Sequence, residues 1–324
     1  MQTLVDFDAA PVFAVPVIGG LGDATAREGM LLEGPQGWGE FSPFDDCSDQ
    51  AAARWLTAAI EAGTVGWPDP VRGRIPIAVT VPAVDPDRAH AIVVDSGCRT
   101  ADVRVALHSG SLAGDLARLE AVRDALGPQG AIRCDADGMW DVDTAVAAIA
   151  ALERAAGGLE YVALPCRTSD ELTAVRRRVD VPVATTVPIR AGDPLRASLV
   201  GAADVAILRT GPLGGARRAL MVADACGLPC VVSSALETSV GLSAGLALAG
   251  ALPDLHFACG LGTRSLLSGD VVAGTRSLVA VGGYLPVAPM PPAPDAELIT
   301  RYQVTDDARI AWWRARLGAA RAAM

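Results

Sequence analysis

Charged side chains that could do chemistry follow several apolar runs of this chain. The segment "ADVRVALH" carries Asp102, Arg104 and His108, "IRCD" ends on Asp135, and "VAILR" ends on Arg209. Carboxylates and imidazoles can transfer protons, with His108 the candidate base, whereas guanidinium groups stay protonated and bind carboxylates through paired hydrogen bonds. These residue types therefore favour a site for an anionic small molecule.

The composition excludes several classes of chemistry and partner. All 27 basic residues are arginine, so lysine Schiff-base and lysine general-base mechanisms are impossible. The seven cysteines lack zinc-ligand spacing, which predicts reduced, buried thiols. A net charge of −10 disfavours nucleic acid and anionic membranes as partners. No apolar run reaches the ~20 residues of a membrane span, and the N-terminus lacks a signal-peptide pattern, so we expect a cytoplasmic protein.

Eight β-branched apolar runs must position these side chains, and they alternate with helical patterns. Such an alternation is typical of a closed parallel (β/α) barrel, with a doubly wound open sheet as the alternative. In these barrels the chemistry lies at the carboxyl ends of the strands. The runs occupy residues 75–81, 101–107, 131–135, 159–164, 181–186, 203–209, 228–233 and 255–260.

The first 74 residues follow a different pattern. "REGMLLEG…GWGEFSPF" predicts antiparallel strands joined by glycine-rich turns, and an alanine-rich helix follows at 49–63. A proline-rich stretch near residue 290 leads to a C-terminal helix. We expect an α+β capping domain formed by 1–74 and completed by 286–324, lying over a barrel domain of residues 75–285.

Four segments point to a known family: "REGMLLEGPQGWGEFSPF", "CDADGMWDVDTA", "PLGGARRAL" and "SSALETSVGLSAGLALAGAL". Together they resemble the o-succinylbenzoate synthases of the enolase superfamily, in their actinobacterial form. The resemblance implies an α/β fold, with an α+β capping domain on a modified (β/α)7β TIM-type barrel. It also implies dehydration of a cyclohexadiene carboxylate in menaquinone synthesis, with an enediolate stabilised on a divalent metal.

Most residues that carry out the family reaction are replaced in this chain, and of the metal-binding acids only the third-strand one survives, as Asp135. The resemblance implies a Lys-x-Lys pair on the second barrel strand, metal-binding acids ending the third to fifth strands, and a lysine ending the sixth. The matching positions here are Asp102 and Arg104, then Asp135, Ala163 and Thr186, then Arg209. Mg²⁺ prefers several hard oxygen ligands, and arginine is no ordinary base. The sequence therefore predicts no catalytic metal, no cofactor and no o-succinylbenzoate synthase activity.

The substrate-binding segments match the family better than the catalytic positions do. From "SSALETSVG", "GPLGG" and the fifth strand we expect seven substrate-binding residues: Ser233, Ser234, Glu237, Thr238, Gly214, Gly215 and Thr186. A glycine-rich turn that opens a helix offers backbone N–H groups to an anion. The acids and arginines at the mouth allow two interpretations, a closed salt-bridge plug or a site where an arginine binds a substrate carboxylate.

These observations favour a repurposed, metal-independent lyase or cyclase of specialised metabolism. Its reaction would be cyclisation, pericyclic closure or dehydration of a carboxylate-bearing or polyene small molecule. The glycines of "IGGLGDA" (18–24), where the family carries arginines, favour a different substrate. One alternative is a non-catalytic pseudoenzyme that binds a metabolite or partner protein. The other is a divergent o-succinylbenzoate synthase of menaquinone biosynthesis.

Overall fold

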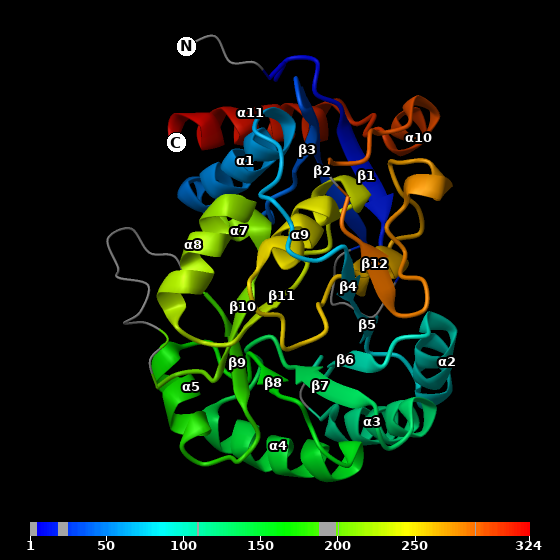
Figure 1. Ribbon diagram of the computed structural model, residues 1–324, viewed down its shortest axis with the longest axis vertical. Coiled ribbons are helices and arrows are strands. Elements are labelled where there is room, and N and C mark those ends of the chain that lie inside the picture. The colour runs from blue at the N-terminus through cyan, green and yellow to red at the C-terminus, as the bar shows by residue number, and fades with distance from the viewer. Residues whose placement is uncertain (1–4, 19–24, 109, 188–198, 200, 289) are drawn as a thin grey trace.

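The computed structural model describes all residues except 1–4, 19–24, 109, 188–198, 200 and 289. It divides into two halves along its long axis (Figure 1). One half holds an antiparallel sheet with helices packed on it, and the other holds a curved parallel sheet surrounded by helices. Across the described part of the chain, each helix is too short or too polar to cross a membrane.

The smaller half is built on the antiparallel sheet β1-β2-β3. The strands are β1 (Val12–Pro16), β2 (Ala26–Gly34) and β3 (Gly37–Phe41). Gly37 closes the tight β2–β3 turn with a φ of +140°, which a residue with a Cβ would adopt only under strain. The sequence therefore forms the predicted hairpin where its glycines permit the turn.

Two long helices cover this sheet, one from each end of the chain. They are α1 (Asp49–Thr64) and α11 (Asp307–Ala322), and Figure 1 shows them side by side. Trp313 of α11 is fully buried, packs edge-on against Phe41, and donates from Nε1 to Glu28 at 2.9 Å. The C-terminal segment thus joins the N-terminal sheet, with the short helix α10 (Ala296–Tyr302) against β1.

The larger half is a barrel of parallel strands. Seven strands are hydrogen-bonded in the order β11-β10-β9-β8-β7-β6-β5. Their bounds are β5 (Ala78–Val81), β6 (Thr100–Arg104), β7 (Ala131–Asp135), β8 (Val162–Ala163), β9 (Val183–Thr186), β10 (Val205–Leu208) and β11 (Cys230–Val232). The alternation of the sequence is therefore realised as a closed barrel, which excludes the doubly wound alternative.

The eighth predicted strand, 255–260, is reduced to single bridges that close the barrel. Cys259 pairs with Ile77 and Gly260 pairs with Ser233, both in parallel. The carbonyl of Ala258 instead accepts a hydrogen bond from a buried arginine inside the barrel. A Cβ on Gly260 would lie only 2.8 Å from the Ser233 hydroxyl, so the close approach requires glycine.

Helices cover the outside of the barrel. They are α2 (Pro86–Ser96), α3 (Leu112–Leu126), α4 (Val142–Ala156), α5 (Ser169–Arg176), α8 (Ala216–Cys226) and α9 (Ser239–Ala251), with a short turn α7 (Thr210–Leu213). Asp85, Asp141 and Thr168 cap three of them by accepting backbone N–H bonds. Helix α9 is buried almost throughout, because it lies between the barrel and the antiparallel sheet. The remaining elements are a small sheet of β4 (Arg74–Pro76) and β12 (Tyr284–Pro286) and two 3₁₀ turns, η1 (Gly262–Leu266) and η2 (Gly274–Arg276).

Side chains alternate between the two faces of every barrel strand. Ala101, Val103, Ile132 and Cys134 belong to the apolar cluster under the outer helices. A separate cluster that includes Tyr161, Ala163, Ala184, Val205, Ile207 and Val231 fills the interior. Residues in phase with the interior cluster, among them Asp135, Thr186 and Arg209, therefore project into the barrel.

Candidate active site

The carboxyl ends of β6 and β7 bring Arg104 and Asp135 together at the barrel mouth. The two residues are paired across the strands, and Arg104 Nη1 lies 3.4 Å from Asp135 Oδ2. Arg104 Nη2 also contacts Asp137 Oδ2 at 2.7 Å. The backbone N–H of Asp137 in turn donates to Asp135 Oδ1 at 3.0 Å. The predicted contact between the second and third strand ends is thus formed, and Asp137 joins it.

Arg209 follows β10 on the interior face. In the described part of the chain its guanidinium makes no hydrogen bond and no ion pair, and its Nε is buried without an acceptor. Burial raises the pKa of Asp135, although the charges of Arg104 and Arg209 act in the opposite direction. Arg209 therefore lies near enough to influence Asp135, as its place at the mouth predicts, but does not contact it.

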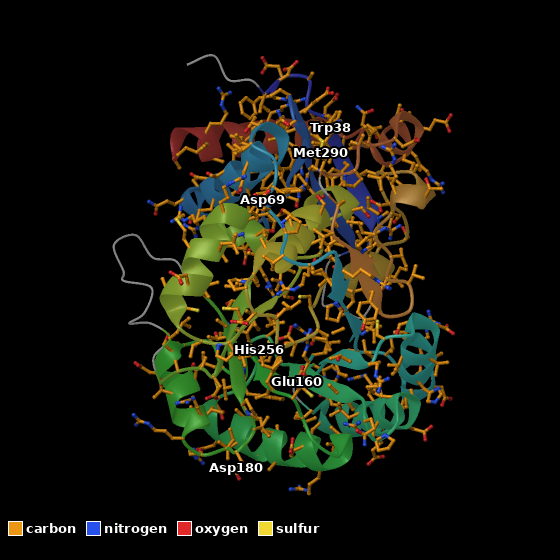
Figure 2. All side chains as sticks on the ribbon, viewed as in Figure 1. Trp38, Asp69, Glu160, Asp180, His256 and Met290 are labelled. Carbon is orange, nitrogen blue, oxygen red and sulfur yellow. The ribbon has the colours of Figure 1, made fainter. Side chains whose placement is uncertain are left out.

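Asp102 does not join the mouth group as we expected. Its carboxylate lies 3.2 Å from Nε of Arg133, which is only 1% exposed inside the barrel. Arg133 also approaches Glu160 at 3.8 Å and packs over the ring of Tyr161 at 5.1 Å. These residues form a charged layer deeper in the barrel than Asp135, because Arg133 precedes Asp135 by two positions on the same face of β7. Figure 2 shows Glu160 in the barrel half, far from Trp38 in the capping half.

His108 is the second misplaced candidate. It is exposed and lines a groove between α3 and α4 with Ser111, Met139 and Trp140, where it makes contacts of its own. Neither Arg104 nor Asp135 lines that groove. His108 is therefore not grouped with Arg104 and Asp135, and its role as a base stays a prediction.

The "SSALETS" segment joins the barrel to the capping half. Glu237 is buried, and its Oε2 accepts from the Ser234 hydroxyl at 2.6 Å and from the Ala235 N–H at 2.8 Å. Thr238 donates its hydroxyl to Glu40 of β3 at 2.5 Å. Ser234, Glu237 and Thr238 are therefore held by internal hydrogen bonds, and their contact with a substrate stays a prediction. Ser233, in phase with the interior Val231, remains directed into the barrel.

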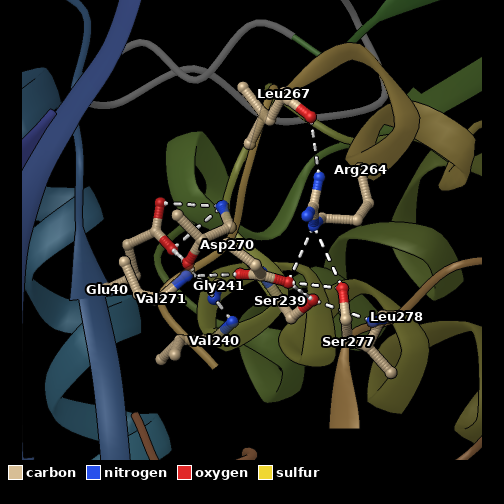
Figure 3. Close-up of polar contacts among 11 residues, drawn as sticks. Glu40, Ser239, Val240, Gly241, Arg264, Leu267, Asp270, Val271, Ser277 and Leu278 are labelled. Carbon is tan, nitrogen blue, oxygen red and sulfur yellow. Dashed lines mark hydrogen bonds and ion pairs between the residues drawn. The ribbon is translucent and has the colours of Figure 1, made fainter. Parts of the chain in front are cut away.

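Glu40 binds the start of α9, as Figure 3 shows. Its Oε2 accepts from the N–H groups of Thr238 and Gly241, both at 3.1 Å, and its Oε1 accepts from the hydroxyl of Ser42 at 2.8 Å. Burial raises the pKa of Glu40 to about 7, while the hydrogen bond from Thr238 and the nearby charge of Arg27 act against this rise. A second buried acid, Asp270, accepts from Ser239 in the same turn of α9. Both carboxylates therefore lie at the positive end of the helix.

The glycine turn at Gly214 and Gly215 is also closed by the protein itself. The carboxylate of Glu61, from α1, accepts from the backbone N–H and the guanidinium of Arg217, each at 3.1 Å. A Cβ on Gly215 would lie 1.7 Å from Glu61 Oε2. The anion at this helix start is thus Glu61, a side chain of the capping half, and a substrate contact of Gly214 and Gly215 stays a prediction.

The residues at the mouth do not fit the divalent metal that the resemblance implies. Of the three matching positions only Asp135 is acidic, and Ala163 and Thr186 offer no carboxylate. Arg104 already faces the carboxylates of Asp135 and Asp137. Within the described ranges, no group of three or more histidine, cysteine or acidic side chains is arranged to hold a metal ion. The absence of a catalytic metal stays a prediction.

Comparisons with known proteins decide the family. The enolase C-terminal domain-like profile matches residues 86–292, and the enolase N-terminal domain-like profile matches residues 12–63. The o-succinylbenzoate synthase of Thermobifida fusca is 53% identical over 312 residues, covering 96% of this chain and 95% of the relative. The chain belongs to the o-succinylbenzoate synthase family of the enolase superfamily.

Other relatives and solved structures agree with this assignment. The o-succinylbenzoate synthase of Mycolicibacterium smegmatis is 45% identical over 313 residues, covering 96% of this chain and 94% of the relative. A muconate lactonizing enzyme from Pseudomonas fluorescens, complexed with muconolactone, has a TM-score of 0.76 at 18% identity, covering 94% and 100% of the two chains. An enolase from Mycobacterium smegmatis, complexed with tartrate, has a TM-score of 0.77 at 20% identity, covering 93% and 90%. The two structures support the fold alone.

These comparisons correct our functional expectation. A chain 53% identical to a named o-succinylbenzoate synthase over nearly its full length supports that enzyme class. The expectation of a repurposed lyase or cyclase with a lost family reaction is therefore wrong, and so is the alternative of a non-catalytic binder. The third reading, a divergent synthase, is the one that the comparisons favour. The loop that suggested a different substrate lies mostly at residues 19–24, outside the described residues.

Proposed function

We propose that this protein catalyses the o-succinylbenzoate synthase reaction, the loss of water from a hydroxylated cyclohexadiene carboxylate to give aromatic o-succinylbenzoate. The observation that carries the proposal is 53% identity over 96% of the chain to an enzyme with that name. The charged barrel mouth supports it, since an acid and arginines face the interior where a carboxylate substrate would enter. The reaction would place the protein in menaquinone synthesis.

The dehydration needs a proton acceptor, and arginine and the absent lysine cannot supply it. The C–H bond beside the carboxylate must break, the hydroxyl must leave as water, and the electron pair must complete the aromatic ring. A carboxylate can take the proton from carbon and return it to the departing hydroxyl when both lie on one face of the ring. One acid–base group then balances the whole reaction and is restored at its end.

Asp135 is the residue that we assign to this role. It projects into the barrel, is 25% exposed, and lies beside the guanidinium of Arg104. Burial raises its pKa, which makes its carboxylate a stronger base than a carboxylate in water. The N–H of Asp137 fixes the orientation of the carboxylate through Oδ1, leaving Oδ2 directed toward Arg104 and the mouth.

The test is turnover of the family substrate by enzyme purified from a host that lacks its own synthase. Product formation is followed by the absorbance of the new aromatic ring. Asp135→Asn keeps the shape but removes the proton acceptor, so kcat should fall by about 10²–10⁴. Asp180→Asn, at an exposed aspartate on the barrel exterior, is the matched control and should leave kcat unchanged. Turnover by the wild type no faster than the uncatalysed reaction would refute the proposal.

A further inference from the structure

Both arginines at the barrel mouth carry a buried N–H group that nothing in the described part of the chain accepts. These groups are Nε of Arg104 and Nε of Arg209. A buried donor without an acceptor costs about 1–3 kcal/mol, so such groups usually have a partner in the working protein. The other nitrogens of Arg104 bind two aspartates, whereas the guanidinium of Arg209 has no hydrogen bond or ion pair within the same residues. Arg209 therefore has the larger unmet demand for an anion.

The two arginines lie on opposite sides of the barrel. Counting from β5, β6 is the second strand and β10 the sixth of the eight segments that close the ring. Arg104 ends one and Arg209 follows the other, both on the interior face. The interior positions between them on β8 and β9 are Ala163 and Thr186, which carry short, uncharged side chains.

The acidic side chains of the barrel interior cannot supply an ion-pair partner for the guanidinium of Arg209. The carboxylates of Asp135 and Asp137 face Arg104, and that of Asp102 faces Arg133 in the deeper layer. A divalent cation near Asp135 would have to displace Arg104 and would meet the charge of Arg209 as well. The positive charge that a ligand finds at this mouth is therefore a pair of guanidinium groups.

We infer that Arg209, with Arg104 opposite, binds the ring carboxylate of the substrate, and that this guanidinium pair supplies the positive charge at the mouth without a divalent cation. The inference rests on the proposed function and names its anion-binding subsite. Arg209 and Asp135 both project into the barrel from strand ends, so a carboxylate bound to Arg209 enters the same interior as the proposed proton acceptor. When the α-proton leaves, negative charge spreads onto that carboxylate, and charge-assisted hydrogen bonds from fixed guanidinium groups strengthen.

The experiment measures binding of the product, 2-succinylbenzoate, by calorimetry in the presence of EDTA. Wild type should bind it, and Arg209→Gln should bind it about 10- to 100-fold more weakly, the loss expected for a charged hydrogen-bonded contact. Arg209→Lys keeps the charge but loses the paired geometry, so its affinity should be intermediate. Arg218→Gln, at an exposed arginine of α8, is the matched control and should bind like the wild type.

Thermal unfolding without ligand separates this role from a structural one. Arg209 has no partner to lose among the described residues, so Arg209→Gln should melt at the wild-type temperature or above it. Only the increase in melting temperature caused by 2-succinylbenzoate should disappear. An Arg209→Gln protein that fails to fold, or melts well below the wild type, would show a structural salt-bridge role and overturn the inference.

The outcomes also distinguish this inference from the proposed function. Binding that depends on Arg209 in EDTA, in an enzyme that does not turn over the substrate, would retain the subsite and refute the function. Turnover with equal affinity in wild type and Arg209→Gln would retain the function and refute the subsite. Binding that appears only after Mg²⁺ is added would overturn the role given to the guanidinium pair.

Discussion

The carboxyl of Glu40 should make the stability of this protein depend on pH near neutrality. Glu40 lies on β3 and binds the first turn of α9, so it joins the capping half to the barrel. It is 7% exposed, and burial raises its pKa to about 7 from 4.5. Replacing it with glutamine keeps an oxygen toward Thr238 and Gly241, and the new amide can donate to the hydroxyl of Ser42. The substitution therefore removes the titration with little change in shape.

The magnitude follows from the two pKa values of Glu40. The folded protein binds the proton more tightly than the unfolded chain, so the stabilisation is fully present below about pH 4.5 and is lost as the pH rises to about 7. At about 1.4 kcal/mol for each tenfold change in proton affinity, the loss amounts to about 3 kcal/mol. Glu40→Gln should therefore gain about 3 kcal/mol relative to the wild type between pH 4.5 and pH 8.

Urea unfolding at several pH values between 4.5 and 8 measures this difference. The quantity to compare is the free energy of unfolding of Glu40→Gln minus that of the wild type, because other titrating groups then cancel. Glu33→Gln, at an exposed glutamate of the neighbouring strand β2, is the matched control and should run parallel to the wild type. Parallel curves for Glu40→Gln and the wild type would refute the reasoning, since they would show that Glu40 has the same proton affinity in both states.

Three further expectations follow from the site. Turnover should be the same in EDTA as in millimolar Mg²⁺, and a rate that requires the added cation would contradict the poor metal fit. Gly215→Ala should lower the free energy of unfolding by about 2 kcal/mol, because φ is +113° and the new Cβ meets Glu61. Gly318→Ala, at an exposed position of α11, should raise it slightly. Asp102→Ala should lower the free energy of unfolding by about 3 kcal/mol, because Arg133 loses an ion-pair partner in the barrel interior. An unchanged urea midpoint would show that Glu160 alone is a sufficient partner for Arg133.

The barrel and part of its mouth could be predicted from the sequence, because both follow from the way apolar and polar residues alternate over a few positions. The apolar runs predicted the strands. The ends of two of these runs placed Arg104 and Asp135 at the mouth, where the two side chains form an ion pair. The same alternation held a signal that we did not use, since Arg133 lies two positions before Asp135 and had to share its face. The ion pair with Arg133 explains why the carboxylate of Asp102 lies in the deeper layer and not at the mouth.

The contacts between the halves could not be predicted in this way. Glu40 binds Thr238 across 198 positions of sequence, and Glu61 binds Arg217 across 156. No local sequence pattern predicts which acidic side chain will bind the N-terminus of which helix. A turn with free N–H groups predicts an anion there, but a protein carboxylate and a substrate satisfy that demand equally well. The sequence therefore predicted an anion at the start of α8, but the backbone N–H groups of Gly214 and Gly215 donate to the carbonyl of Thr210, and the N–H that meets a carboxylate is that of Arg217.

The charges inside the barrel are arranged in two layers, and this arrangement bears on the choice between a plug and a ligand site. In the deeper layer, Arg133 is matched by Asp102 and Glu160. At the mouth, Arg104 is matched by Asp135 and its neighbour Asp137. A closed plug of Arg104, Arg209, Asp102 and Asp135 would have needed Asp102 at the mouth, but Arg133 holds it below. Among the described residues at the mouth, the guanidinium of Arg209 is left without an ion-pair partner. Substitutions of Asp102 should therefore lower the stability, and substitutions of Arg209 should lower the affinity for an anion.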